Sequence, residues 1–383
     1  MILVRVSLFF ILLLLLPDWY IYKVYIKQAA QVWIKKLYWL PTVLLLLALV
    51  IFVAAHDSLH DAFGVYLIIT LCFAVPKLIF VLCDVVLRAL HRLVRVPLYH
   101  KSVSTVVAVA TLGYVLFGAI WGKEYFQVKQ VTFSSPDLPA AFDGYRILQL
   151  SDIHSGSWKG NAEALQRAIA LCNAQHPDLA VFTGDLVNSR ADEMKEFMPV
   201  FSKLHTKDGV FSVLGNHDYG TYVRWNSEAE RLANIDTLVM REEQMGWKML
   251  MNDHRIIRRG NDSIALIGVE NSGRPPFPDR GDLPRAQQGT EGMFKVLLSH
   301  DPTHWRRSVL PDTDIQLMLA GHTHDMQVNL FGFSFSRFIY PEYKGLYLQD
   351  GRGLYVNIGL GYVLFPMRLG AWPEITVITL RKK

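Results

Sequence analysis

The stretch LQLSDIHSG, residues 148–156, places an apolar, strand-like run directly before an aspartate and a histidine that are separated by one residue. Successive side chains of a strand point to opposite faces, so Asp152 and His154 share one face. A surface pair is the default interpretation of a single Asp-x-His. The pair indicates a functional site only if other strands end in residues of the same kinds.

Four more apolar runs end in polar signatures: PDLAVFTGD, GVFSVLGNHD, FKVLLSHDP and IQLMLAGHTH. These ends supply Asp185, then Asn216, His217 and Asp218, then His300, and finally His322 and His324. In open α/β folds, ligands bind at the carboxyl ends of the strands. We therefore expect the side chains of all these strand ends to converge on one spot.

The residue types at these ends suit divalent metal ions. Carboxylate oxygens, imidazole nitrogens and an amide oxygen are ligands for Mn, Fe or Zn, whereas a structural zinc site typically uses thiolates. An aspartate between two ions can bridge them at the ~3.5–4 Å separation of two-metal hydrolases. Gly184, Gly215 and Gly321 stand among these residues, and we expect them to let the backbone turn sharply beneath the ions.

Residues 131–383, which carry these motifs, alternate strand-like runs with amphipathic helical ones. In NAEALQRAIALCNAQ, residues 161–175, leucine, isoleucine and alanine recur at helical spacing, and SEAERLANI, residues 227–235, is also helix-prone. This alternation is typical of stacked β-α units. We therefore predict an α/β domain over residues 131–383.

Residues 1–125 are far more apolar and contain four long hydrophobic runs. Each run is close to the ~20 residues that cross a bilayer core, which predicts about four transmembrane helices. A buried helical bundle of a soluble domain is the alternative for the last three runs. A cleaved signal peptide is the alternative for the first run, but this run lacks a basic start and a small-residue cleavage site.

Basic residues between the runs predict the orientation in the membrane. The first connection contains four lysines, at positions 23, 27, 35 and 36, and the third contains Arg88, Arg92, Arg95 and Lys101. The second connection, HDSLHDA at residues 56–62, contains neither residue type. Because lysine and arginine accumulate on the cytoplasmic side, we expect residues 131–383 outside the cytoplasm. In a bacterium with two membranes, this means an inner-membrane protein with a periplasmic domain.

Charge and cysteine content exclude two classes of protein. The net charge of +5 reflects the residues flanking the apolar runs, and no basic cluster interleaved with aromatics predicts a nucleic-acid partner. Cys72 and Cys83 lie in the third apolar run, and Cys172 lies in a helix-like stretch. The sequence therefore predicts no disulfide framework.

The ordered motifs resemble the calcineurin-like metallophosphoesterases over about residues 145–380. Within that family the chain is similar to a membrane-associated bacterial branch, which closes with a strand, a Gly-Leu-Gly turn and a Pro-Glu-Ile strand. Here these elements are LYVNIGLG, residues 354–361, and WPEITVITL, residues 372–380. Many relatives have an arginine just before the Gly-Leu-Gly turn. This chain has Ile358 instead, which removes any phosphate contact of that arginine, although Arg368 lies nearby in sequence.

The resemblance implies a two-sheet β sandwich flanked by helices, a four-layer α/β/β/α arrangement, that follows an N-terminal transmembrane region. It also implies hydrolysis of phosphate esters with two divalent ions, among which manganese is favoured over iron and zinc. The residues implied for the first ion are Asp152, His154 and His324, with Asp185 bridging, and those for the second are Asn216, His300 and His322.

The expected mechanism follows from these charges. Two cations lower the pKa of a shared water, so that hydroxide forms near neutral pH, and they neutralise the phosphoryl oxygens during in-line attack. The leaving alkoxide still requires a proton, and the resemblance makes His217 the general acid. We expect Asp218 to orient His217.

Two further features are open to two interpretations each. Glu270–Gly289 is rich in proline, glycine and arginine and is predicted to be a functional loop. Its Arg274 and Arg280 either meet a phosphate or headgroup or are solvated. Tyr219 and Tyr222, which follow the GNHD motif, either line the site or pack elsewhere.

Three functions remain open from the sequence. The first is a membrane-anchored phosphodiesterase or phosphomonoesterase that acts on an external phosphorylated small molecule or lipid, with membrane lipids as further partners. The second is a lipid-directed pyrophosphatase such as UDP-2,3-diacylglucosamine hydrolase, whose substrate is made on the opposite, cytoplasmic side. The third is a non-catalytic membrane binding protein, which would be expected to lose ligands, whereas this chain has the full set.

Overall fold

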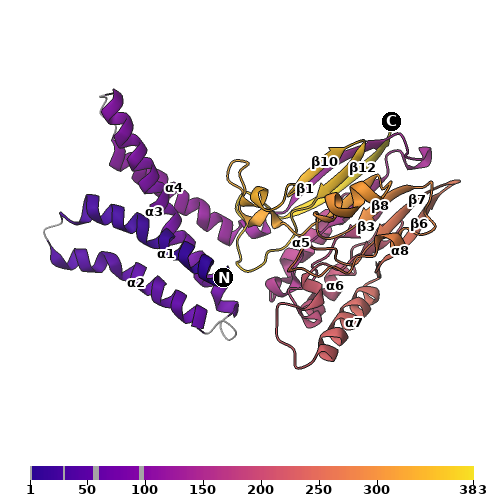
Figure 1. The fold of residues 1–383 in the computed structure, drawn as a ribbon, viewed down its shortest axis with the longest axis horizontal. Helices are drawn as coiled ribbons and strands as arrows, with labels where there is room; N and C mark the ends of the chain where they lie inside the picture. Colours follow the sequence, from indigo (N-terminus) through magenta and orange to yellow (C-terminus); the bar gives the residue numbers. More distant parts are fainter. Residues whose placement is uncertain (1, 29–30, 55–59, 95–98) are drawn as a thin grey trace. The chain divides into compact units, whose positions relative to one another are not determined.

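The computed structural model describes residues 2–28, 31–54, 60–94 and 99–383. It divides into two compact units (Figure 1). The first unit ends at Trp121 but also includes Leu364–Leu369, and the second consists of Gly122–Val363 and Gly370–Lys383.

The first unit is a set of long apolar helices. They are α1 (Ile2–Ile21), which a π-helical turn extends over Tyr22–Ile26, then α2 (Val32–Ala54), α3 (His60–Val94) and α4 (His100–Ile120). Among the described residues, four stretches are long and apolar enough to span a membrane: Leu8–Ile26, Val32–Ala54, Ala62–Val94 and His100–Ile120. The prediction of about four such helices is therefore confirmed.

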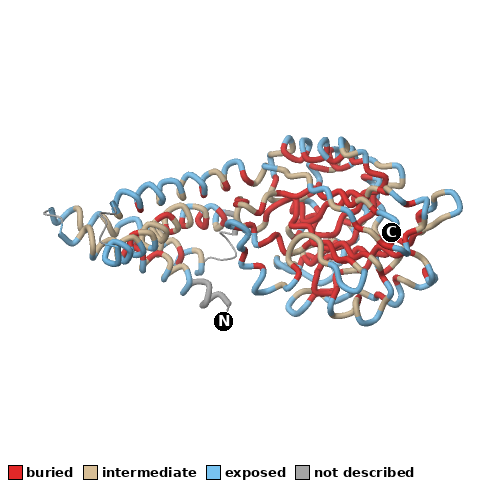
Figure 2. Tube along the Cα trace, turned by 90° about the horizontal axis from the view of Figure 1, so that it is seen from above, coloured by how far each residue is buried: buried red, intermediate tan, exposed pale blue. Residues whose placement is uncertain are grey.

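The outward faces of these helices are apolar. Leu16, Leu44 and Val106 are each more than half exposed, and Figure 2 shows that most residues of the helices are exposed or intermediate. Large apolar side chains facing outward all along a helix are suited to lipid rather than to water. Residues 55–59 and 95–98, which carry part of the charge pattern used to predict orientation, lie outside the described residues.

Polar contacts join the helices inside this apolar unit. Asp18 of α1 is fully buried and accepts hydrogen bonds from Tyr38 and Thr42 of α2 and from Lys77 of α3, whose Nζ lies 2.6 Å from the carboxylate. A charge in an apolar environment is tolerated when an opposite charge and hydrogen bonds satisfy it. Asp18 therefore fixes how α1, α2 and α3 pack together.

A second buried carboxylate, Asp84 of α3, joins α1, α3 and α4 in the same way. Its oxygens lie 2.7–2.8 Å from the hydroxyls of Tyr20 and Tyr25, from Nε of Arg88 and from Nδ1 of His100. The residues Leu364–Leu369 also pack into this unit, where the N–H of Arg368 donates to the carbonyl of Gly118 at 3.2 Å. Arg368 itself is fully buried.

The second unit contains two six-stranded mixed sheets. The first has the order β1 (Gln127–Ser135), β12 (Glu374–Lys382), β2 (Arg146–Leu150), β3 (Leu179–Phe182), β4 (Val210–Ser212) and β5 (Trp247–Met249). The second has the order β10 (Gly345–Gln349), β11 (Arg352–Val356), β9 (Leu317–Ala320), β8 (Phe294–Leu298), β7 (Asp262–Gly268) and β6 (Asp253–Arg259). The neighbours β2, β3, β4 and β5 are parallel, as are β7, β8, β9 and β11.

Strand alternation divides the apolar residues into three layers of core. In β2, Leu148 packs toward the helices α5 (Ala162–Asn173), α6 (Met198–Phe201) and α7 (Glu228–Gln244), whereas Ile147 packs between the sheets. In β8, Val296 lies between the sheets, and Leu297 faces the outer layer that contains α8 (Leu283–Ala286) and the turn before α9 (Leu310–Asp312). Figure 2 shows the buried residues concentrated in this unit. The predicted α/β/β/α sandwich is confirmed.

Candidate metal centre

The predicted ligands come together at the ends of strands from both sheets. Asp152 and His154 follow β2, Asp185 follows β3, and Asn216 follows β4 in the first sheet, whereas His300 follows β8 and His322 and His324 follow β9 in the second. All of these residues are buried except His322, which is partly exposed. Within the described residues, ligand atoms of Asp152, His154 and His324 lie within 4.8 Å of one another, and the same holds for Asp185, His300 and His322.

Backbone conformation marks the same residues. Asp152, His154, Asp185, His322 and His324 all have φ between +51° and +75°, in the left-handed region. For residues other than glycine, such conformations cost about 1–3 kcal/mol each and persist only where the surroundings impose them. Here hydrogen bonds between the backbones that follow neighbouring strands hold these conformations. The N–H of Asp152 donates to the Gly184 carbonyl, and the N–H of His154 donates to the Asp185 carbonyl.

Of the three glycines expected to allow a sharp backbone turn, only Gly184 has a positive φ, at +94°. At Gly215 and Gly321 the requirement is space rather than backbone freedom. A Cβ at Gly215 would lie 2.2 Å from Oδ1 of Asp185, and a Cβ at Gly321 would lie 2.3 Å from Oδ2 of Asp152. These two glycines let the carboxylates sit directly against neighbouring loops.

The first ligand group brings three potential ligand atoms to one spot. Nε2 of His154 lies 3.0 Å from Nε2 of His324, and Nε2 of His324 lies 3.2 Å from Oδ1 of Asp152. Burial lowers the pKa of His154, and the neighbouring imidazoles lower it further, so this ring is neutral. A neutral imidazole nitrogen and a carboxylate that point at one spot are the donor atoms of a transition-metal site.

Asp185 stands between the two ligand groups. Its Oδ2 lies 3.8 Å from Nε2 of His154 in one group and 3.2 Å from Nε2 of His300 in the other. His300 in turn lies 3.1 Å from Oδ1 of Asn216 and 3.3 Å from Nδ1 of His322. A single carboxylate is thus placed where it can contact ions held by either group.

The charges of the buried carboxylates favour positively charged groups at the site. Burial alone lowers the pKa of His300, but the carboxylates of Asp185 and Asp152 outweigh burial and raise it to about 10. Burial raises the pKa of Asp185, but the charges of His300 and His217 hold it well below its usual range. Buried carboxylates that face several imidazoles, with no lysine or arginine among the main causes of their pKa shifts, fit a site for divalent cations.

His217 lies beside the ligands with its ring fixed. Its Nδ1 lies 2.7 Å from the carbonyl of Asn188, its backbone N–H donates to Oδ1 of Asp185, and its ring stacks on Tyr222 at 4.1 Å. The carbonyl accepts only from a protonated nitrogen, so Nδ1 carries a hydrogen and Nε2 is the atom that exchanges a proton.

The expectation that Asp218 orients His217 is wrong. The Asp218 carboxylate accepts backbone N–H groups of Asp185, Leu186, Val187 and Gly215 at 2.8–3.2 Å. Both of its oxygens are therefore occupied in joining the loops after β3 and β4. Burial and the charge of Asp185 raise the pKa of Asp218 to about 7, against the effect of the backbone donors. The residue positions Asp185, and the carbonyl of Asn188 orients His217.

Aromatic side chains surround the ligands, and the sequence did not assign most of them. Tyr222 lies at the site, where its hydroxyl accepts a hydrogen bond from Nδ2 of Asn216 at 2.7 Å. The hydroxyl of Tyr340 lies 2.9 Å from Nε2 of His322, and the ring of Phe277 meets His322 edge-on at 4.7 Å. Tyr219 instead is buried and contacts Glu270. The loop Glu270–Gly289 thus reaches the site through Phe277, which supports its interpretation as functional.

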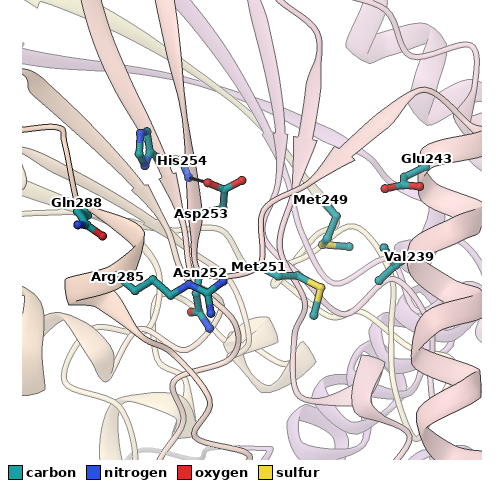
Figure 3. Close-up of a pocket in the computed structure, with 9 residues that line it drawn as sticks. All are labelled: Val239, Glu243, Met249, Met251, Asn252, Asp253, His254, Arg285 and Gln288. Carbon is teal, nitrogen blue, oxygen red and sulfur yellow. Dashed lines mark hydrogen bonds between the residues drawn. The ribbon is translucent and has the colours of Figure 1, made fainter.

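A separate pocket of about 480 Å³ lies between the end of β5, the start of β6, α7 and α8. Figure 3 shows its lining, which includes Met249, Asp253, His254 and Arg285. None of the candidate metal ligands lines this pocket, so it is distinct from the metal centre.

Comparisons with known proteins identify the two parts of the chain. A family model described as "Calcineurin-like phosphoesterase" matches residues 145–326, and one described as "Probable Calcineurin-like phosphoesterase, transmembrane domain" matches residues 4–123. The uncharacterized metallophosphoesterase YkuE of Bacillus subtilis is 31% identical over 65% of this chain and 84% of its own length. The family resemblance is therefore confirmed.

A zebrafish (Danio rerio) relative, "Transmembrane protein with metallophosphoesterase domain", is 30% identical over 74% of this chain, and this chain spans only 63% of that relative's length. The crystal structure of TT1561 of Thermus thermophilus is 14% identical, with a TM-score of 0.37, over 56% of this chain and 90% of that one. Because this structural score is low, the family assignment rests on the sequence matches.

Replacing Asp218 with alanine should destabilise the α/β unit by about 2 kcal/mol or more, because four backbone N–H groups lose their acceptor inside the protein. Asp218→Asn, which keeps one carbonyl oxygen, should lose less stability. Thermal unfolding followed by tryptophan fluorescence measures both, with the exposed Asp236→Ala as the control. An Asp218→Asn chain of unchanged stability but ~10²-fold lower activity would restore a direct role in proton transfer.

Proposed function

Because this chain belongs to the calcineurin-like phosphoesterase family, we propose that it is a membrane-anchored hydrolase that cleaves phosphate esters with two divalent metal ions. The observation that carries this proposal is the position of Asp185 between two groups of buried ligands. One ion would be held by Asp152, His154 and His324, and the other by Asn216, His300 and His322. Asp185 would bind both ions. This set of carboxylates, imidazoles and an amide oxygen suits manganese, iron or zinc, and manganese is the ion we propose.

When bound, the two ions would activate a water for attack and neutralise the phosphoryl oxygens. The protein itself supplies the proton for the leaving group. The ring of His217 is held through Nδ1 by the Asn188 carbonyl and is stacked on Tyr222, and one of its nitrogens lies within 4.8 Å of ligand atoms of His154 and Asp185. A fixed imidazole that gives up a proton as the ester bond breaks is a general acid.

The substrate side of the site is aromatic with a nearby positive charge. Tyr222, Phe277 and Tyr340 border the ligands, and the positive charge of Arg274 acts on Tyr340. We assign to exposed Arg274 any phosphate contact that an arginine at the position of Ile358 would make. Arg368 does not suit that role, since it is fully buried within the first unit.

We place the chain in the inner membrane of a bacterium, with the catalytic unit in the periplasm, because the basic residues cluster in the first and third connections. The substrates we propose are therefore phosphodiesters or phosphomonoesters, of small molecules or lipids, on that side. Hydrolysis of UDP-2,3-diacylglucosamine requires the opposite orientation and is the second candidate. A purely binding role is disfavoured because the ligand set is complete.

His217→Ala should slow hydrolysis of an alkyl phosphodiester by ~10²–10⁴-fold, which is the contribution of a general acid. The loss should be much smaller for a nitrophenyl phosphodiester, because nitrophenolate leaves without a proton. Steady-state rates on the two esters test this, and metal analysis of the same preparations checks that the ions remain. Equal losses on both esters would mean that His217 is not the acid.

Alkaline phosphatase fused after Lys383 should be active in bacterial cells, and a fluorescent protein that matures only in the cytoplasm should stay dark at the same position. Fusions after Ala54, which is followed by the connection without lysine or arginine, should give the same results as fusions after Lys383. Fusions after Val94 should give the opposite pattern, because that connection is basic. Reversed results at all three positions would move the site to the cytoplasm and favour the UDP-2,3-diacylglucosamine reaction.

A further inference from the structure

One segment of the α/β unit is exposed and strongly apolar. This segment, Leu330–Ile339, has the sequence LFGFSFSRFI and is called the aromatic loop below. Phe331 is fully exposed, Phe335 is 63% exposed and Phe338 is 71% exposed. The rings of Phe333, Phe335 and Phe338 lie 5.4–6.3 Å from one another, so they form one continuous apolar surface. Soluble surfaces rarely carry such a patch unless it binds something.

The aromatic loop is built to keep this surface outward. The buried Ser334 donates through its hydroxyl to the Asp325 carbonyl at 2.9 Å, and the buried Asn329 donates to the Asp325 carboxylate at 2.6 Å. The backbones of Leu330 and Phe333 exchange hydrogen bonds of 2.8 and 2.9 Å around the tip. The two serines of the loop are thus buried while the aromatic rings are exposed, which is the reverse of a typical water-exposed loop.

The tip of the loop is strained. Phe331 has φ +53°, a conformation that is a genuine outlier for a bulky side chain. The surroundings impose it through the Leu330–Phe333 bonds and through Gly332, whose N–H donates to Oδ1 of Asn329 at 3.0 Å. Strain that holds an aromatic ring in full exposure indicates a contact surface.

Both ends of the loop lead to the metal centre. His322 and His324 precede it in sequence, and Tyr340, which follows it, contacts Nε2 of His322 at 2.9 Å. Thr323, between the two histidines, donates to the carbonyl of Tyr343 at 2.6 Å. The base of the aromatic loop therefore adjoins the second ligand group.

We propose that the aromatic loop docks the catalytic unit on a lipid bilayer and that the adjoining site thereby takes phosphate esters that carry acyl chains. The substrate part of this inference rests on the proposed phosphoesterase function, and the docking part does not.

Connectivity and charge favour lipid as the occupant. Helix α4 ends at Ile120 and β1 begins at Gln127, so only residues 121–126 connect that membrane helix to the first strand of the α/β unit. The one charged residue in the loop sequence is Arg337, and a positive charge among aromatics suits anionic headgroups. Phenylalanines flanked by a basic residue are typical of segments that lie in the membrane interface.

The docking test uses the full chain in phosphatidylcholine and phosphatidylglycerol vesicles that contain spin-labelled quenching lipids. An environment-sensitive fluorophore is attached at Phe335→Cys after Cys72, Cys83 and Cys172 are replaced by alanine. The matched label site is Leu232→Cys, an exposed leucine on α7. We expect a blue-shifted, quenched signal at position 335 and neither effect at position 232. Equal signals at the two positions would overturn docking. A chain-to-chain disulfide in the unlabelled Phe335→Cys chain, with no quenching in the labelled one, would also overturn it and would identify a second copy as the occupant.

The substrate test compares two esters with one leaving group in the same vesicles: bis(nitrophenyl) phosphate and a diacylglycerol nitrophenyl phosphate. The triple variant Phe331→Gln, Phe335→Gln and Phe338→Gln should lose ~10-fold or more on the lipid ester and retain its rate on the soluble one. The control triple is Leu171→Gln, Leu232→Gln and Met240→Gln, which removes apolar side chains of moderate exposure from α5 and α7. Equal lipid-ester rates for the two triples would overturn the substrate part. No hydrolysis of any ester by the unaltered chain would instead contradict the proposed function, and quenching would still decide docking.

Discussion

The carboxylate of Asp185 is the point on which the rest of the site depends. Oδ1 accepts the backbone N–H of His217 at 2.8 Å, while Oδ2 faces imidazoles of both ligand groups. Its own N–H is held by Asp218, and its approach is possible only because position 215 is glycine. Removing this charge would leave the imidazoles of the two ligand groups with no common counter-charge. Both proposed metal sites and the orientation of the proposed acid are therefore linked to one residue.

Much of this arrangement was accessible from the sequence because strand periodicity and strand ends are local signals. The apolar runs predicted the strands, and the polar residues after each run predicted a common edge. The role of Asp218 and the contact of His217 with Asn188 were not accessible. These depend on where loop backbones pass, and no spacing in the sequence encodes that path. Tyr340 was missed for the same reason, since it is far from His322 in sequence and meets it only through the aromatic loop.

The two apolar regions of the chain were predictable to different degrees. Hydropathy alone indicated the long helices, because about twenty apolar residues suffice to cross a bilayer. Hydropathy did not predict that the buried carboxylates of Asp18 and Asp84 connect those helices. In the aromatic loop, phenylalanine at positions 331, 333 and 335 has the period of a half-buried strand, but the structure buries the serines and exposes the rings. The alternation of residue types shows that the two faces of a segment differ. Which face is buried depends on the elements that pack against the segment.

Metal content measured on the purified full chain tests the central claim most directly. After reconstitution with manganese and removal of excess ion, mass spectrometry of the bound metal should give about two ions per chain. Asp185→Asn should lower this value sharply, while the exposed Asp236→Asn should leave it unchanged. Fewer than one ion in the unaltered chain, or an undiminished content in Asp185→Asn, would contradict a shared carboxylate between two metal sites.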